Sequence, residues 1–335
     1  MTKPHGPSLH GLFVGLTTLD CIYQADHPPA ENEKVVAQKS LLVAGGPATN
    51  AAVAFNQFGG KFGTQAADGQ AADGQTADGK GNQATLLSVI GEHSLTSVIT
   101  EDLQGQGVRL VDLMPTRLAP PPVSSIVVTQ ATGDRTVITR NAQHMQAQAT
   151  DISPDILTGI DVVLIDGHQM AVSAQIAQWA KAKDIPIVID AGSWKPNFET
   201  VLALADVVVA SANFYPPGCD TPSAVLDYLK TLNITKRAIT RGSKPILYCE
   251  GNQPGEQASE VEVPQIRAVD TLAAGDIFHG SFCHFHLGHT FTEALLKASR
   301  SASFACQYWG TRDWTKIYRM ADTDSEEAAC KESEN

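Results

Sequence analysis

Strand-length runs of apolar residues alternate along the chain with stretches of helical pattern, and this alternation limits the fold more than any other feature. The expected buried strands are residues 10–16, 85–90, 161–165, 185–189, 206–210 and 237–240, and helical stretches at 173–183 and 223–232 lie between strands. Strands that alternate with helices form βαβ units around a mostly parallel sheet that is flanked by helices. The sequence therefore predicts an α/β fold whose ligands lie beyond the carboxyl ends of the strands.

Two segments break this alternation and predict a small antiparallel β lid. Residues 124–130 and 135–140 read SSIVVTQ and RTVITR, which indicates a hairpin with its turn near Gly133. Residues 21–43 are mixed and look extended. We therefore expect lid segments near residues 20–44 and 122–141.

A low-complexity insert and an acidic tail stand apart from the folded body. Within the insert, at 64–83, the pentads AADGQ, AADGQ and TADGK follow one another from residue 66 to residue 80. Such a segment has too little apolar surface to bury and should form a mobile surface loop. The tail, 322–335, carries six acidic residues and should be disordered. One domain is thus expected over residues 1–321.

Composition excludes several classes of partner. The 335 residues are 43% hydrophobic, and their formal net charge is −12. The sequence contains no basic stripe of the kind that binds nucleic acid. There is no Lys- or Arg-rich amphipathic stretch, apolar signal region or membrane-length apolar run, so neither a membrane nor secretion is expected. Six scattered cysteines without a CxxC pair are typical of reduced thiols in a cytoplasmic protein.

Residues 269–282, VDTLAAGDIFHGSF, carry the strongest chemical signal. If a helix begins in the small-residue run Ala273, Ala274 and Gly275, its first backbone N–H groups converge and can bind a phosphate. Asp276 on the same turn could accept a proton from a group that attacks that phosphate. An anion site beside a base is the minimum equipment for phosphoryl transfer, although an ordinary helix N-cap has the same look.

A second glycine-rich motif lies far upstream at residues 43–60, VAGGPATNAAVAFNQFGG. Gly45 and Gly46 precede Pro47, which suits the first turn of a helix over residues 48–58. The glycines let a ligand lie against bare backbone, and Asn50 offers a donor and an acceptor to hydroxyl groups.

The two motifs together resemble those of the PfkB-type carbohydrate kinases, the ribokinase-like family. That family carries GG-x-x-x-N early in the chain and DTxGAGD-x-F late, and here the segments read GGPATN at 45–50 and DTLAAGDIF at 270–278. Ala273 replaces the first glycine of GAGD. The resemblance runs from about residue 11 to residue 321 without the insert. It implies a ribokinase-like fold with a β lid, and these stretches look closest to sulfofructose kinase and ketose kinases.

The resemblance assigns roles to the motif residues. It implies that Asp276 is the general base and that the N–H groups of Ala273, Ala274, Gly275 and Asp276 form the anion hole. It also implies that Asp20, which follows the first strand, contacts the substrate, as do Gly45, Gly46 and Asn50. Arg140 ends the lid hairpin and could reach a substrate group, although a solvated charge is an equal alternative.

Nucleotide contacts are expected on later strands. Thr240 and Gly242 resemble the T-x-G nucleotide contact of the family, and Asn213 begins its N-x-x-E motif, although Pro216 stands where the glutamate is usual. Gly275 would also lie against the phosphates. ATP and the Mg²⁺ carried with it are the expected cofactors. A monovalent cation at Asp270 is an option in some relatives, with capping or salt bridging as the equal alternative.

Three histidines late in the chain do not form a predicted metal site. On a helix, His284 and His286 point about 200° apart, and only His286 and His289 share a face. Two ligands without a third are poor zinc chemistry.

These observations favour an ATP-dependent kinase that phosphorylates a primary hydroxyl of a small sugar, a ketose or modified ketose. A nucleoside kinase with the same fold is one alternative. A protein that binds sugar or nucleotide without catalysis is another, because the glutamate after Asn213 is missing. A homodimer through the lid would also suit the resemblance.

Overall fold

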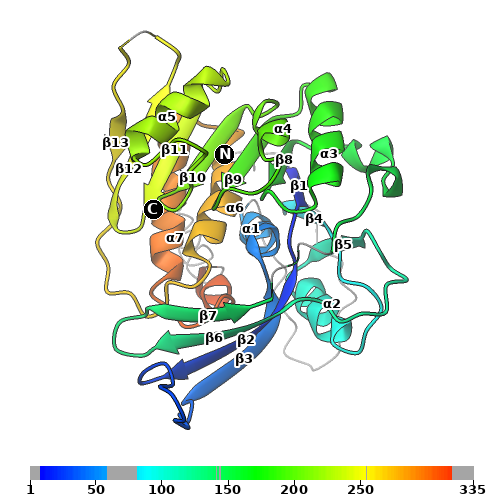
Figure 1. Ribbon diagram of the computed structural model, residues 1–335, viewed down its shortest axis with the longest axis vertical. Helices are drawn as coiled ribbons and strands as arrows, with labels where there is room; N and C mark the ends of the chain where they lie inside the picture. The colour runs from blue at the N-terminus through cyan, green and yellow to red at the C-terminus, as the bar shows by residue number, and fades with distance from the viewer. Residues whose placement is uncertain (1–7, 59–80, 141, 143–144, 254, 319–335) are drawn as a thin grey trace, which may run out of the picture.

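The computed structural model describes residues 8–58, 81–140, 142, 145–253 and 255–318, and within them a nine-stranded sheet forms the centre of the protein (Figure 1). In spatial order from one edge, its strands are β13 (Ser259–Val261), β12 (Lys244–Glu250), β11 (Lys236–Arg241), β10 (Val207–Ser211), β9 (Ile187–Ala191), β8 (Val162–Ile165), β1 (His10–Val14), β4 (Gln83–Ser88) and β5 (Val108–Asp112). The strands from β11 to β5 pair in parallel, and β12 and β13 are antiparallel to their neighbours. The predicted mostly parallel sheet is confirmed.

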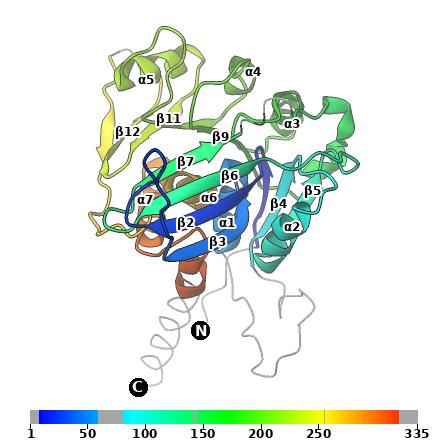
Figure 2. The ribbon, with the colours of Figure 1, turned by 60° about the horizontal axis from the view of Figure 1, so that its bottom comes forward.

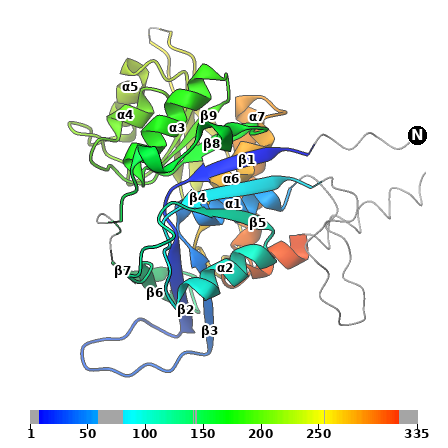
Figure 3. The ribbon, with the colours of Figure 1, turned by 90° about the vertical axis from the view of Figure 1, so that its right-hand side faces the viewer.

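Helices cover both faces of this sheet (Figure 3). One face carries α3 (Met170–Ala182), α4 (Glu199–Leu202) and α5 (Pro222–Thr231), and the other carries α1 (Pro47–Asn56), α2 (Thr96–Gly105), α6 (Ala274–His286) and α7 (Phe291–Ala305). Successive strand residues point to opposite faces. Leu12 therefore packs in the cluster that includes α3, whereas Phe13 packs on Phe55 of α1 with ring centroids 5.4 Å apart.

The lid is a second sheet, of four strands in the described part of the chain, which lies below the main sheet in Figure 1 and toward the viewer in Figure 2. Its strands lie in the order β3 (Lys39–Gly45), β2 (Thr18–Ala25), β6 (Val123–Thr129) and β7 (Arg135–Thr139). The outer pairings are antiparallel, as expected, but the central pairing of β2 with β6 is parallel. Two helices and two strands of the main fold separate β2 from the hairpin β6–β7 in sequence, so a local pattern could not fix this pairing.

Most of the insert and the whole acidic tail lie outside the described residues. The predicted insert boundary at residue 83 is wrong, because Gln83 already begins β4. Asn82 is buried and donates a hydrogen bond to the carbonyl oxygen of Phe55 at 3.1 Å. None of the described helices is both long enough and apolar enough to span a bilayer.

Candidate active site

The first turn of α6 carries Asp276, and the residue before the helix has an unusual backbone conformation. Ala273 adopts the left-handed region with φ 60° and ψ 12°, which costs an L-residue roughly 1–2 kcal/mol. Its methyl group is buried in a cluster with Ala54, Ile277 and Trp314, and this packing offsets part of the cost. Alanine is thus compatible with a turn in which the resemblance places glycine.

Backbone N–H groups at this turn form a candidate anion site. Ala274 is an exception to the expected set, because its N–H already donates to the carbonyl oxygen of Thr271 at 3.3 Å. Within the described part of the chain, the N–H groups of Ala273, Gly275 and Asp276 have no acceptor. Gly275 is exposed, and a Cβ built on it would meet no heavy atom within 4 Å. The open space beside these amides suits a phosphate oxygen.

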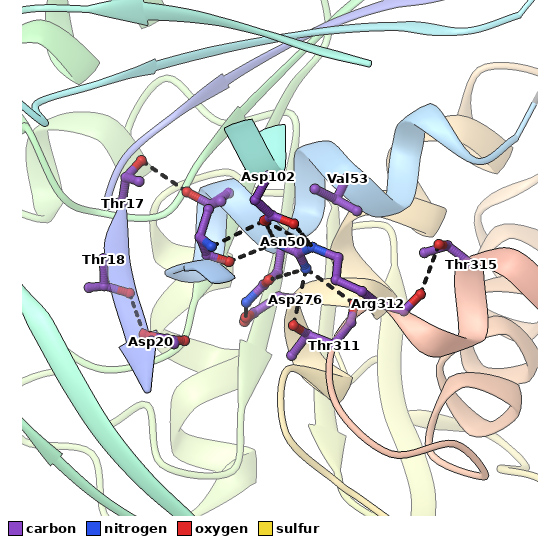
Figure 4. Close-up of polar contacts among 12 residues, drawn as sticks. Thr17, Thr18, Asp20, Asn50, Val53, Asp102, Asp276, Thr311, Arg312 and Thr315 are labelled. Carbon is purple, nitrogen blue, oxygen red and sulfur yellow. Dashed lines mark hydrogen bonds and ion pairs between the residues drawn. The ribbon is translucent and has the colours of Figure 1, made fainter. Parts of the chain in front are cut away.

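The Asp276 carboxylate lies half-buried at the centre of the site (Figure 4). Its Oδ2 accepts a hydrogen bond from Nδ2 of Asn50 at 2.9 Å. Burial and then the charge of Asp190 raise the pKa of Asp276 to about 7, against the opposing effects of Asn50, His279 and Arg135. A carboxyl group with a pKa near neutrality can both take up and release a proton at physiological pH.

Two ionisable side chains that the sequence analysis did not identify lie beside this turn. The ring nitrogens of the buried His279 lie 2.7 Å from the carbonyl oxygen of Gly275 and 3.1 Å from that of Val209 on β10. Its Nδ1 is also 3.5 Å from a carboxylate oxygen of Asp190. His279 therefore connects the start of α6 to the main sheet. The position of Asp190 directly after the apolar run 185–189 was the available sequence signal.

Asp20 lies on β2 and faces the glycine motif. Its Oδ1 accepts a hydrogen bond from the Thr18 hydroxyl at 2.6 Å, and a Cβ on Gly45 would come within 1.9 Å of its Oδ2. Burial raises the pKa of Asp20, while hydrogen bonds from Thr18 and Ser124 oppose that rise. The absence of a side chain at Gly45 is what gives the Asp20 carboxylate its place.

The rest of the glycine motif positions Asn50. Gly46 has φ 99°, and a Cβ there would lie 2.3 Å from the carbonyl oxygen of Leu16, so only glycine fits. Asn50 is buried one turn into α1, and its Oδ1 accepts a hydrogen bond from Nη1 of Arg312 at 3.1 Å. The Asn50 oxygen and one amide hydrogen thus already have partners within the protein, and the contact of Asn50 with a substrate stays a prediction.

The lid hairpin carries a second arginine besides the predicted Arg140, and this second one contacts the segment before α6. Arg140 lies exposed just after β7. Arg135, at the start of β7, donates from Nη1 to the carbonyl oxygen of Thr271 at 3.1 Å. Gly133 in the hairpin turn accepts from both the N–H and the hydroxyl of Thr271, at 3.1 and 3.0 Å. The tip of the lid is thus docked on the segment that precedes α6.

The predicted nucleotide contacts lie on neighbouring strands of the main sheet. Thr240 is the next-to-last residue of β11 and donates from its hydroxyl to the carbonyl oxygen of Ala210 on β10 at 3.3 Å. Gly242, with φ 64°, makes the turn between β11 and β12, so the turn alone accounts for glycine there. Asn213 is exposed just after β10, and its N–H donates to the Ser211 hydroxyl at 3.0 Å. These positions lie near or just beyond the carboxyl ends of β10 and β11, and His279 of α6 contacts Val209 of β10.

Asp270 acts as a structural anchor in front of α6. One carboxylate oxygen accepts the N–H of Leu272 at 2.9 Å, and the other accepts the N–H of Gly310 at 2.8 Å. Burial raises the pKa of Asp270, and these two hydrogen bonds oppose the rise. Capping, one of the two expected alternatives, is what the side chain does in the described part of the chain, and a cation at Asp270 stays a prediction.

Asp166 is a further carboxylate that the sequence analysis missed, at the end of β8. It accepts the N–H groups of Leu16 and Ala48 at 2.9 and 3.2 Å, and thereby ties β1 to the start of α1. Its burial would raise the pKa, but the charge and hydrogen bond of His168, the charge of Lys195 and the N–H of Leu16 hold that pKa at about 2. It therefore stays ionised and fixes the loop below the glycine motif.

The three late histidines are packing residues in this structure. His284 stacks on Phe58 and His286 stacks on Phe282, with ring centroids 5.2 and 5.1 Å apart. Burial lowers the pKa of each of these two histidines to about 4. Nδ1 of His289 lies 3.1 Å from the carbonyl oxygen of Phe285. The neutral rings of His284 and His286 therefore contribute aromatic contacts.

Comparison with known proteins places the chain in a family. Residues 10–316 match the pfkB family carbohydrate kinase domain. A putative ribokinase from Agrobacterium tumefaciens is similar over 96% of this chain and 99% of its own, with a TM-score of 0.77 and 23% identity. Ribokinase from Arabidopsis thaliana, solved with ribose and ATP, is similar over 93% of this chain and 99% of its own, with a TM-score of 0.65 and 19% identity. A putative ribokinase II from E. coli, solved with ATP and Mg²⁺, is similar over 92% of this chain and 96% of its own, with a TM-score of 0.66 and 16% identity. The chain belongs to the pfkB family of carbohydrate kinases.

Proposed function

We propose that this protein transfers the γ-phosphoryl group of ATP to a primary hydroxyl of a small sugar, with Asp276 as the general base. The observation that carries the proposal is a carboxyl group with a pKa of about 7 on the same helical turn as three N–H groups without acceptors in the described chain. A base and an anion site at one point are what such a transfer needs.

The expected course of the reaction follows from these positions. Nδ2 of Asn50 donates a hydrogen bond to Oδ2 of Asp276. Oδ1 would then take the proton of the sugar hydroxyl as the sugar oxygen attacks phosphorus. The amides of Ala273, Gly275 and Asp276 would stabilise the charge on the transferred phosphoryl group. Asp20 would hold neighbouring sugar hydroxyls, since a carboxylate accepts several hydrogen bonds. The lid over the site would keep water from competing with the sugar.

The nucleotide would lie along the edge formed by β10 and β11. The expected contacts are Asn213, Thr240, Gly242 and Gly275, and the Arabidopsis and E. coli proteins of the same fold were solved with ATP. Magnesium bound to the nucleotide would neutralise phosphate charge. Magnesium keeps several waters and needs few protein ligands. Among the described residues no cluster of three His, Cys, Asp or Glu could hold a metal, so the nucleotide and water would supply most ligands of the ion.

A ketose or modified ketose is the proposed acceptor, on the likeness of the glycine and late motifs to ketose kinases. A nucleoside kinase remains the alternative enzyme. A non-catalytic binding protein is the alternative from another class, and the loss of the glutamate after Asn213 is the observation in its favour. The retained carboxyl group at 276 favours an enzyme, because a binding protein has no use for a base at that point.

A coupled assay of ADP release with ketoses, aldoses, ketose derivatives and nucleosides separates these functions. We expect release that depends on one ketose-type sugar. Release with nucleosides alone would support the nucleoside kinase. No release with any acceptor, together with a sugar-dependent rise in melting temperature, would support the binding protein and refute the proposal.

A homodimer through the outer face of the lid is also proposed. Tyr23, Leu42 and Ile138 are 40%, 55% and 75% exposed, and Leu42 and Ile138 fall in one row across the four paired strands. Exposed apolar side chains gathered on one sheet face favour association. Light scattering coupled to size exclusion should give a dimer mass that falls to the monomer mass in Ile138→Asp. A monomer of the unaltered protein would refute this.

A further inference from the structure

Arg312 is a buried arginine whose contacts reach three elements of the active site (Figure 4). It follows α7, and its side chain is 6% exposed. Nη1 donates to Oδ1 of Asn50 on α1, and Nη2 donates to Asp102 of α2 at 2.9 Å and to the carbonyl oxygen of Ala44 on β3 at 2.6 Å. The guanidinium therefore contacts the lid strand β3, the helix α2 and the glycine-motif helix α1 at once.

The contact with Asn50 determines which way its amide group points. A guanidinium has only donors, so the group of Asn50 that faces Arg312 must be the oxygen. The amide nitrogen then necessarily faces the other side, where it donates to Oδ2 of Asp276 at 2.9 Å. Without the guanidinium, the amide could rotate and place its oxygen against the carboxylate, where two acceptors repel each other.

Asp102 holds the guanidinium in this position. Nε of Arg312 donates to Oδ1 of Asp102 at 3.3 Å and Nη2 donates to its Oδ2 at 2.9 Å, which is the paired geometry that suits a planar arginine. The same oxygen accepts the N–H of Ala44 at 3.1 Å. Arg312 thus has its charge compensated and its fork fixed, so it can orient the neutral Asn50 without leaving an unpaired buried charge.

We propose that Arg312 is a positioning residue for the reaction at Asp276. It orients the Asn50 amide so that Nδ2 holds one oxygen of the carboxylate and the other oxygen remains free for the proton of the acceptor hydroxyl. This inference rests on the proposed kinase function. It deepens that function, because it assigns a task in the reaction to a residue that follows α7, far from both glycine motifs in the sequence.

A purely structural role is the competing explanation. In that case, Arg312 would only fasten the segment after α7 to α2 and β3, and its loss would lower stability without changing how Asp276 titrates. The two explanations differ in their predictions for the pH dependence of turnover and for the combined effect with Asn50.

The test compares Arg312→Lys, Arg312→Gln, Asn50→Ala and the Arg312→Gln/Asn50→Ala double variant by kcat, KM and pH profile. Misplacing a reacting group costs about 10- to 100-fold, so we expect such a loss of kcat in Arg312→Gln with little change in KM for ATP. Loss of the Asn50 hydrogen bond should move the acid limb of kcat/KM to higher pH, because that bond favours the ionised carboxylate. Asp190, His279 and Arg135, the other charges around Asp276, are unchanged in every variant.

The double variant decides whether the effect passes through Asn50. We expect it to be about as slow as Asn50→Ala alone, because the amide that Arg312 orients is already absent. Arg312→Lys should recover part of the activity, since lysine can donate to Asn50 but lacks the fork that binds Asp102. If Arg312→Gln does not fold, Arg312→Lys and Asn50→Ala still report the shift of the acid limb.

Arg237 offers a matched control away from the site. It is 2% exposed and donates to Glu256 at 2.9 Å and to the carbonyl oxygens of Gly251 and Ile234. Arg237→Lys should lower the melting temperature without moving the acid limb. The proposal would be overturned if the fold-losses of kcat in the two single variants multiplied in the double variant. It would also be overturned if the acid limb of kcat/KM stayed in place in Arg312→Gln.

A measurement without turnover separates this inference from the proposed function. The stability change caused by Asp276→Asn, followed against pH, reports the titration of Asp276, and it can be measured both with Arg312 in place and in the Arg312→Gln background. We expect the titration of Asp276 to lie at higher pH in the Arg312→Gln background. An unchanged titration would refute the positioning role of Arg312. If no acceptor yields ADP, the proposed function fails even where this titration moves as expected.

Discussion

Replacing Asp276 by asparagine should make the protein more stable and far less active at the same pH. The pKa of Asp276 rises from 3.8 to about 7 on folding, chiefly because the group is buried and faces Asp190. The folded protein therefore binds the proton more tightly than the unfolded chain. Stability from this group is fully present below about pH 4 and is lost as the pH rises through about 7.

The size of the effect follows from the shift. About three pKa units at roughly 1.4 kcal/mol each correspond to about 4 kcal/mol of stability lost by ionisation above pH 7, taken as an upper figure for a half-buried group. An amide at 276 carries no charge, and its oxygen can still accept the hydrogen bond from Asn50. Asp276→Asn should therefore gain up to about 4 kcal/mol at pH 8 and under about 1 kcal/mol at pH 4. Its kcat should fall by about 10²- to 10⁴-fold, as for the loss of a general base.

Urea unfolding followed by tryptophan fluorescence, without ligands, measures this difference at both pH values. Asp313→Asn is the matched control, because the Asp313 side chain is 51% exposed and pairs with the exposed Lys316 at 3.4 Å, so its replacement should change stability little at either pH. Equal stability of the unaltered protein and Asp276→Asn at pH 8, or a gain of the same size at pH 4, would show that the carboxyl group is not held as described.

Three further predictions concern the site itself. The free enzyme should lose kcat/KM as the pH falls through about 7, because protonated Asp276 cannot act as a base, and a profile that is flat from pH 6 to 8 would contradict this. Gly275→Ala should keep or raise the melting temperature, since alanine favours a helix over glycine by roughly 0.5–1 kcal/mol. It should nevertheless lower kcat/KM for ATP, because its methyl group would fill the open space proposed for the phosphate. Unaltered kinetics would exclude a phosphate at that place. Gly45→Ala should raise KM for the sugar at least about tenfold and leave KM for ATP unchanged, because its Cβ would displace the Asp20 carboxylate. A tenfold loss of affinity corresponds to about 1.4 kcal/mol of binding free energy. An unchanged KM for the sugar would show that Asp20 does not bind it.

Much of the fold could be predicted because its signals are local. Apolar runs marked the central strands, Gly46 and Pro47 marked the start of α1, and the turn at Gly133 marked the lid hairpin. The parallel pairing of β2 with β6 has no such signal, because it joins segments about a hundred residues apart. Register between distant strands depends on the packing of the whole domain.

The parts of the site that sequence reasoning missed are held by long-range contacts. Arg312 lies 262 positions from Asn50 and 210 from Asp102, and no spacing rule connects them. His279 was visible within the late motif, but its link to Asp190 requires β9 and α6 to be placed side by side. Asp166 and Asp190 could have been suspected, since each directly follows a predicted buried strand, the position where such sheets hold ligands.

Phosphorus NMR of ATP mixed with the accepted sugar tests the central claim most directly, because it observes the transferred group itself. The account predicts a new phosphate ester signal on a primary carbon that grows in step with ADP and is nearly absent with Asp276→Asn. Free phosphate in place of the ester, or an ester formed at an undiminished rate by Asp276→Asn, would contradict it.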